Sequence, residues 1–299
     1  MNRKLIARLG IFIVGLPLIL SIVFIKFHNH LALHALICLV CCMSANEAYN
    51  IFSTKVALMR RMYIIMAAVF IPLIAAFYEV IPTFFQNLYF PGTNNEVITY
   101  AFIISVLFIL FTEVVTAKTF NESLERISFS IFIVLYSGYL LTFVSRMTVM
   151  TRFGHDVSTY AIAIFLLMVF LCDSFAWFFG ILFGKNNRGF IKASPNKSIA
   201  GFAGGFLGAL TAGFAGYFCM PFLFQGSPVK VSILAVCVAF SSIVGDLVES
   251  ILKRSAKIKD SGNIIPGRGG ILDCVDSISL AAPVYYFLLV LFYGPLILS

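Results

Sequence analysis

Long apolar runs separated by short polar segments constrain the fold of this chain more than any other feature. A membrane-spanning helix needs about 20 mainly apolar residues. Nine runs meet this requirement, near residues 6–27, 31–49, 62–80, 97–117, 128–146, 158–183, 200–224, 229–251 and 276–298. Hydrophobic residues make up 61% of the chain, and its mean hydropathy is +1.00. We therefore predict an all-α integral membrane protein with about nine transmembrane helices.

The distribution of basic residues predicts how these helices are oriented, because cytoplasmic loops carry an excess of Lys and Arg. The first run is too long for a signal peptide and no small-residue cleavage site follows it, so we interpret it as a retained helix. We place the N-terminus in the cytoplasm. Only four of the 21 basic residues then fall on the opposite side: Lys26, Arg146, Arg152 and Lys230.

Charged side chains concentrate between Ser250 and Asp276, in the segment SILKRSAKIKDSGNIIPGRGGILDCVD. Charge beside a bilayer is costly and usually serves a function. Acidic residues that alternate with a basic cluster and a Gly-rich turn can hold metal ions and a polyphosphate together. This segment is therefore the first candidate for a functional site.

The end of the eighth run is expected to be a helix with one polar face. At about 100° per residue, four side chains lie within roughly 60° of one another: Asp246, Ser250, Lys253 and Lys257. Glu249 flanks this polar face on one side. The Gly-rich turn at 266–270 lets the chain fold back so that Asp273 faces Asp246. Two carboxylates from two helices can bind Mg²⁺, which fills its shell with water and phosphate oxygens. The alternative is that the lysines are interface anchors and Asp246 is a buried packing residue.

A second polar segment, Lys192–Ser198, lies between the sixth and seventh runs. A hydroxyl such as that of Ser194 and a cation such as Lys197, placed before a helix start, can grip phosphate. The alternative is a capped helix start with an interfacial lysine. Asp173, in the sixth run, is an intramembrane acid and so a further functional candidate. Glu47 and Glu113 lie near the predicted cytoplasmic ends of their spans, and we assign them no role.

The two segments together resemble the signatures of phosphatidate cytidylyltransferases, also called CDP-diacylglycerol synthases. The matching positions are Ser194, Pro195, Lys197, Ser250, Lys253, Arg254, Lys259, Asp260, Pro266, Gly269, Gly270, Asp273 and Asp276. Three positions depart from the pattern. Arg268 replaces the usual His, Cys274 replaces the usual Arg, and Ser198 replaces the usual Thr.

The resemblance implies a reaction in which CTP and phosphatidate give CDP-diacylglycerol and pyrophosphate. Together with the expected facing of Asp246 and Asp273, it gives a catalytic role to Asp246, Lys253, Asp273 and Asp276. The substrate-binding residues would be Ser194, Lys197, Ser250, Arg254, Lys259, Asp260 and Arg268. The cofactor would be Mg²⁺ at Asp246, Asp273 and Asp276, with a monovalent cation such as K⁺ as a further candidate.

The same resemblance divides the chain into N-terminal transmembrane helices, residues 1–150, and C-terminal catalytic helices, residues 151–299. The expected location is the cell (inner) membrane with the site on the cytoplasmic side, where CTP and membrane phospholipids meet. The sequence holds no nucleic-acid-binding module, so the net charge of +8 reflects topology and anionic headgroups. Small residues that are mostly four apart in the seventh run favour tight helix packing and are compatible with a homodimer contact. They are Gly201, Gly205, Gly208, Ala212 and Gly216.

Three alternatives stay open at this point. A related CTP-dependent enzyme would act on an isoprenoid lipid phosphate or a long-chain alcohol. A transporter would use Asp173, Asp246 and Glu113 to relay ions, although the acids gather towards one side and no repeat is evident. An inactive scaffold would account for the departures at Arg268 and Cys274.

Overall fold

The structure is a computed structural model that describes residues 14–85, 93–265, 267, 269–293 and 297–298. Within this part of the chain, eight helices are long and apolar enough to cross a membrane. The predicted all-α membrane fold is confirmed, and the prediction of about nine spans is close. The first predicted span, 6–27, lies partly outside the described residues. Its described part contains a short helix, α2 (Leu16–Phe24).

Contacts within the chain divide it into two compact units. Unit 1 comprises Met1–Thr148 and Ser255–Cys274, and unit 2 comprises Val149–Arg254 and Val275–Ser299. One boundary therefore lies close to residue 150. The segment that joins the last two helices groups with the N-terminal helices, although it follows most of unit 2 in the sequence.

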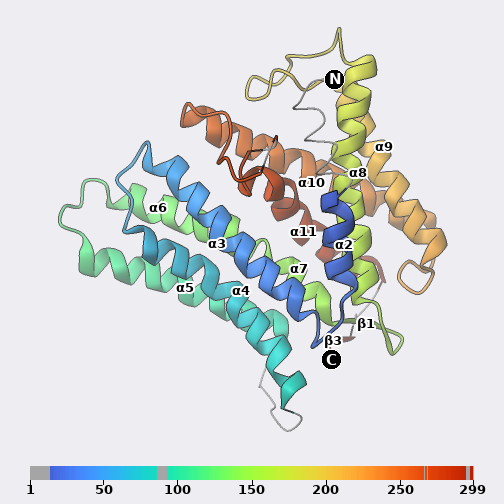
Figure 1. Cartoon of the computed structure of the whole chain (residues 1–299), viewed down its shortest axis with the longest axis horizontal. Helices are drawn as coiled ribbons and strands as arrows, with labels where there is room; N and C mark the ends of the chain where they lie inside the picture. The colour runs from blue at the N-terminus through green and yellow to red at the C-terminus, as the bar shows by residue number, and fades with distance from the viewer. Residues whose placement is uncertain (1–13, 86–92, 266, 268, 294–296, 299) are drawn as a thin grey trace. The chain divides into compact units, whose positions relative to one another are not determined.

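Unit 1 is built from antiparallel helices in which α4 contacts both α3 and α5 (Figure 1). The elements are α3 (Leu31–Ser53), α4 (Arg61–Phe84), α5 (Asn94–Thr116), α6 (Ser123–Ile133), the π-helical turn η2 (Val134–Tyr139), α7 (Thr142–Arg146) and the 3₁₀ turn η3 (Met147–Val149). Helix α5 begins with a reciprocal cap between Thr93 and Glu96. A Cβ on Gly138 would lie 2.7 Å from the carbonyl oxygen of Ala68, so η2 can approach α4 closely only with glycine there.

Unit 2 contains four long helices and a small sheet. The helices are α8 (Ser158–Phe183), α9 (Ile199–Cys219), α10 (Pro228–Ser255) and α11 (Leu272–Tyr293), whose ends at Ser255 and Leu272–Cys274 belong to unit 1. The strands are β1 (Met150–Arg152), β2 (His155–Asp156) and β3 (Ile297–Leu298), which pair antiparallel in the order β2-β1-β3. Helix α11 begins at Leu272 rather than near the predicted residue 276, so Asp273 and Asp276 both lie at its start.

Small residues let α8 and α9 pack at close range. A Cβ on Gly201 would lie 2.9 Å from the carbonyl oxygen of Ala176, and one on Gly204 would lie 2.7 Å from that of Phe175. Gly208 approaches the Leu171 carbonyl oxygen in the same way. The predicted tight packing is therefore confirmed. Because α8 of the same chain covers these glycines, they do not supply a surface for a second copy.

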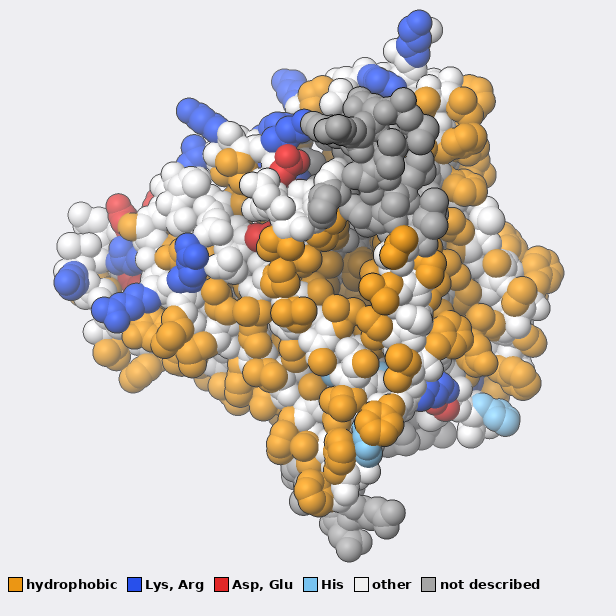
Figure 2. Space-filling view, in the orientation of Figure 1, with side chains coloured by type: hydrophobic (Ala, Val, Ile, Leu, Met, Phe, Trp, Pro, Cys, Tyr) orange, Lys and Arg blue, Asp and Glu red, His pale blue; other side chains and the backbone are white. Residues whose placement is uncertain are grey.

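On the face that Figure 2 shows, many of the side chains are hydrophobic, as expected of helices that face lipid. Large apolar side chains such as Phe111, Val114 and Leu291 are more than half exposed. Soluble proteins rarely expose large apolar patches. Together with the eight candidate spans, this surface identifies a multi-pass membrane protein.

Candidate active site

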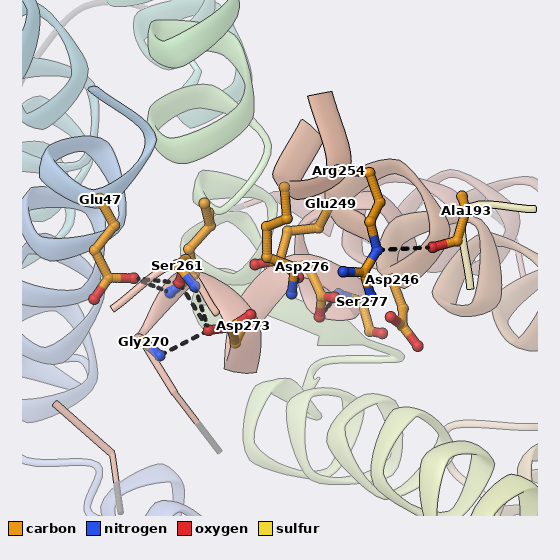
Figure 3. A network of polar contacts seen from close by, with 12 residues as sticks. Glu47, Ala193, Asp246, Glu249, Arg254, Ser261, Gly270, Asp273, Asp276 and Ser277 are labelled. Carbon is orange, nitrogen blue, oxygen red and sulfur yellow. Dashed lines mark hydrogen bonds and ion pairs between the residues drawn. The ribbon is translucent and has the colours of Figure 1, made fainter. Parts of the chain in front are cut away.

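In unit 2, the structure brings the two polar segments of the sequence into direct contact. The Nζ atom of Lys197 lies 2.5 Å from Oδ2 of Asp246. Both side chains are partly open to solvent, with exposed fractions of 23% and 39%. The Nε atom of Arg254 also donates a hydrogen bond to the carbonyl oxygen of Ala193, at 3.4 Å. The segment before α9 thus lies against the polar half of α10 (Figure 3).

The start of α9 follows the prediction in position but differs in its hydrogen bonding. Ser198 caps the helix, and its Oγ accepts a hydrogen bond from the Gly201 N–H at 3.0 Å. The Ile199 N–H donates to the carbonyl oxygen of Asn187, and the Ala200 N–H donates to its side-chain oxygen. Protein acceptors therefore occupy these first N–H groups. Any phosphate held here would be held by side chains such as Lys197 and Ser194, not by the helix start.

A second ion pair lies one turn further along α10. The Nζ atom of Lys253 is 2.5 Å from Oε2 of Glu249, four residues earlier, and the Glu249 side chain is 1% exposed. Asp246, Ser250 and Lys253 lie on α10 as predicted, and Ser250 is partly exposed. Glu249 was predicted only to flank this polar face. The structure makes it the direct partner of Lys253.

Asp276 is, like Glu249, a buried acid of this group. It is 5% exposed, and its Oδ1 accepts a hydrogen bond from the Ser277 N–H at 2.6 Å. The negative charges of Asp246, Glu249 and Asp173 all act on it. Gly245 of α10 touches the Asp276 carbonyl oxygen, since a Cβ there would overlap it. Glycine at 245 therefore allows these helices to bring the acids together (Figure 3).

In unit 1, the residues between α10 and α11, 256–271, form what we call the signature loop. It contains a tight turn in which Ile265 and Gly269 exchange two backbone hydrogen bonds. Gly267 and Gly269 have φ angles of +80° and +112°, a region that favours glycine. Lys259 and Asp260 are exposed in this loop. Arg268, predicted to bind substrate, and Pro266 lie outside the described residues.

Asp273 organises the signature loop from the first turn of α11. Its Oδ2 accepts hydrogen bonds from the Gly270 N–H at 2.7 Å and from the Ser261 N–H at 2.9 Å. The Ser261 hydroxyl lies 2.9 Å from the same oxygen. A Cβ on Gly269 would collide with this carboxylate. The predicted metal ligand Asp273 is therefore, in this structure, a hydrogen-bond acceptor for the loop around it (Figure 3).

Glu47, for which the sequence predicted no role, contacts the signature loop as Asp273 does. Its Oε1 accepts a hydrogen bond from the Ile271 N–H at 3.0 Å, and its Oε2 accepts one from the Leu272 N–H at 2.8 Å. The Ser261 hydroxyl also lies 2.8 Å from Oε2. The only sequence signal for this residue was an acid within an apolar span. Glu113 shares that signal but pairs with Arg126 at 2.8 Å.

The acids of unit 2 suit a magnesium ion by the chemistry of their donors. Mg²⁺ prefers oxygen ligands, and one or two carboxylates are enough when water and phosphate complete its shell. Asp246 and Asp276 supply such carboxylates within one unit. Asp273 belongs to the other unit. Within the part of the chain that the structure describes, no group of three His, Cys, Asp or Glu side chains forms a preassembled metal site.

The chain is similar to proteins of one family. A family model described as "Cytidylyltransferase family" matches residues 6–292. The chain is 34% identical over 194 residues to a phosphatidate cytidylyltransferase of Bacillus subtilis, covering 63% of this chain and 66% of the relative. It is 36% identical over 132 residues to that of Thermotoga maritima, covering 43% and 48%. It is 30% identical over 222 residues to that of Rickettsia felis, covering 69% and 94%. The alignments thus span less than two thirds of the Bacillus and Thermotoga proteins.

Proposed function

Since the chain belongs to the cytidylyltransferase family, we propose that it is a membrane nucleotidyltransferase that converts CTP and phosphatidate into CDP-diacylglycerol and pyrophosphate. The relatives named phosphatidate cytidylyltransferase support this assignment. The observation that carries it is the contact between Lys197 and Asp246. This contact joins the two polar segments that the reaction would require to act together.

The reaction needs no nucleophile from the protein, because the lipid supplies one. An oxygen of the phosphatidate phosphate attacks the α-phosphorus of CTP and forms the new P–O bond. The bond from that phosphorus to the β-phosphate breaks, and pyrophosphate leaves. The protein's task is to position two anions and to stabilise the charge that develops on them.

Cations in unit 2 are placed for that task. Lys197 contacts Asp246 of α10, and Arg254 of the same helix contacts Ala193. Both cations therefore lie where α10 meets the segment before α9. Lys253 lies in the last turn of the same helix, directly before Arg254. We propose that these three side chains bind the phosphates of CTP and that the Ser194 hydroxyl assists them.

We propose that Asp246 and Asp276 hold Mg²⁺. When bound, the ion neutralises negative charge on the phosphates and on the pyrophosphate leaving group. Asp246 is the more open of the two carboxylates and would meet the nucleotide complex first. Asp273 as a third ligand and K⁺ as a second ion remain predictions from the family resemblance.

We also propose that the site faces the cytoplasm of a cell membrane. CTP is cytosolic, whereas phosphatidate presents its phosphate at headgroup depth. The basic residues Lys197, Lys253 and Arg254 lie near the ends of long apolar helices, where both substrates can be reached. The excess of Lys and Arg on the predicted cytoplasmic side supports the same orientation.

The test is pyrophosphate release by the detergent-purified full chain, given CTP, Mg²⁺ and one lipid at a time. We expect release with phosphatidate, loss of at least about 100-fold in Asp246→Asn, and little change in Glu122→Gln, which removes an exposed carboxylate paired with Arg126. An isoprenoid phosphate and a long-chain alcohol form the comparison arms. Activity only with one of these lipids, or none in folded protein, would overturn the proposal.

A further inference from the structure

A single glutamate of α3 holds both the signature loop and the start of α11. The carboxylate of Glu47 accepts two backbone hydrogen bonds, from Ile271 and Leu272, and lies within hydrogen-bond distance of the Ser261 hydroxyl. All these residues belong to unit 1. One side chain thus contacts two separate parts of the loop, at Ser261 and at Ile271.

The backbone of the signature loop approaches this buried carboxylate closely. Glu47 is 3% exposed. A Cβ on Gly262 would lie 2.6 Å from its Oε1, and a Cβ on Gly270 would collide with its Oε2 and with the Ser261 hydroxyl. The absence of a side chain at Gly262 and Gly270 therefore lets the signature loop pack against an acid from a distant part of the chain.

The chemistry of the partners explains why an acid stands here. A buried carboxylate is costly unless hydrogen bonds compensate it. Backbone N–H groups at a helix N-terminus are good partners, because the helix dipole favours negative charge there. Hydrogen bonds to a charged acceptor are also stronger than neutral ones. Glu47 therefore fixes the start of α11 more firmly than a neutral side chain of the same shape can.

We propose that Glu47 is a positioning residue for cytidylyl transfer: it holds the signature loop and the first turn of α11, and so fixes the direction of the Asp273 side chain. Asp273 receives its hydrogen bonds from Ser261 and Gly270, next to the groups that Glu47 holds. Losing the Glu47 carboxylate would loosen both sets of contacts. The catalytic part of this inference rests on the proposed function, whereas its structural part does not.

Hydrogen exchange of the ligand-free, detergent-purified full chain tests the structural part. We compare the native chain with Glu47→Gln, which keeps the shape and removes the charge. Amides within 257–273 are expected to exchange about tenfold faster or more in the variant, because hydrogen bonds to a charged acceptor are lost. Amides of α5 are expected to be unchanged.

Glu79→Gln is the matched control. Glu79 is also a buried acid of unit 1 and accepts a hydrogen bond from Asn29 at 3.2 Å, away from the loop. This variant is expected to leave exchange within 257–273 unchanged. Glu47→Asp keeps the charge but shortens the reach, so it provides a second variant if Glu47→Gln does not fold. Unchanged loop exchange in a folded Glu47 variant would overturn the proposal.

Kinetics separate a positioning role from a purely structural one. In Glu47→Gln, kcat is expected to fall by about tenfold or more with near-native thermal stability, and Glu47→Asp should recover part of it. Faster loop exchange with an unchanged kcat would overturn the catalytic part. If the native chain turns over no CTP, the proposed function fails, and loop exchange alone then decides whether Glu47 holds the loop.

Discussion

The ammonium of Lys197 and the carboxylate of Asp246 lie 2.5 Å apart, which joins the start of α9 to the middle of α10. Partly exposed ion pairs contribute little to stability, about 0–1 kcal/mol. Lys197→Ala is therefore expected to leave the thermal unfolding temperature nearly unchanged. If Lys197 binds the phosphates of CTP, the same variant should lose about 100-fold in kcat/KM for CTP.

Lys192→Ala is the control for this prediction, because Lys192 is exposed in the same segment. It should retain kcat/KM within about threefold, as expected of a surface position with little influence on the site. A Lys197→Ala protein with native kcat/KM would remove Lys197 from the site. Equal losses in both variants would indicate a general effect of positive charge at the membrane surface.

Asp276 leads to a prediction about magnesium and stability. This buried carboxylate lies in the field of Asp246, Glu249 and Asp173, and like charges close together are unfavourable. Asp276→Asn should therefore raise the unfolding temperature in EDTA, by roughly 2–4 °C for each kcal/mol of repulsion removed. Because Mg²⁺ stabilises only a form that binds it, the variant should also gain less from added Mg²⁺ than the native chain.

Thermal unfolding with and without Mg²⁺ checks both parts. Ca²⁺ at the same concentration is a useful comparison, since its larger shell suits a different geometry. A native chain whose unfolding temperature does not respond to Mg²⁺, with or without CTP, would contradict the metal site. An Asp276→Asn protein that is less stable in EDTA would show that the hydrogen bond to Ser277 outweighs the repulsion.

Local patterns in the sequence were enough to predict most of the fold. Apolar runs located the long helices because a bilayer demands about 20 apolar residues per span. The predicted start of α11, near residue 276, is too late, because an apolar run marks only the apolar part of a helix and not its polar first turn. It also missed η2 (Val134–Tyr139), since the π-helical turn depends on the approach of Gly138 to α4 rather than on local propensity.

The candidate site was only partly accessible to the same reasoning. Lys197 and Asp246 were predicted as site residues, but nothing in the sequence indicated that they touch. Glu47 was visible only as an acid within an apolar span, because its partners Ser261 and Leu272 are more than 200 positions away. Long-range hydrogen bonds of this kind are set by tertiary packing, which no local pattern reports.

The glycines of α9 lead to a stability prediction. Gly208 touches the carbonyl oxygen of Leu171 on α8, so an added methyl group has no space. Gly208→Ala is expected to cost about 1–3 kcal/mol, as other overpacked sites do. Ala203→Leu, at an exposed position of the same helix, should be nearly neutral. Thermal unfolding in detergent measures both, and equal stability of the two variants would contradict the packing argument.

Ser261 stands between two carboxylates, and this arrangement leads to a prediction of coupling. Its hydroxyl lies 2.8 Å from Oε2 of Glu47 and 2.9 Å from Oδ2 of Asp273. A hydroxyl has one proton to donate, so it can satisfy only one of the two acids at a time. Ser261→Ala should lower kcat because it leaves both carboxylates without this donor, although their backbone partners remain.

Because Ser261 and Glu47 share one contact, their effects on kcat should not add. The double variant Glu47→Gln and Ser261→Ala is expected to differ from the sum of the single variants by about 0.5–3 kcal/mol. Ser53→Ala is the matched control, since the exposed Ser53 hydroxyl donates only to the carbonyl oxygen of Asn50 on its own helix. Its effect should add to that of Glu47→Gln within about 0.5 kcal/mol. Additivity in both pairs would mean that Glu47 and Ser261 act on the loop independently, which the shared hydrogen bond does not allow.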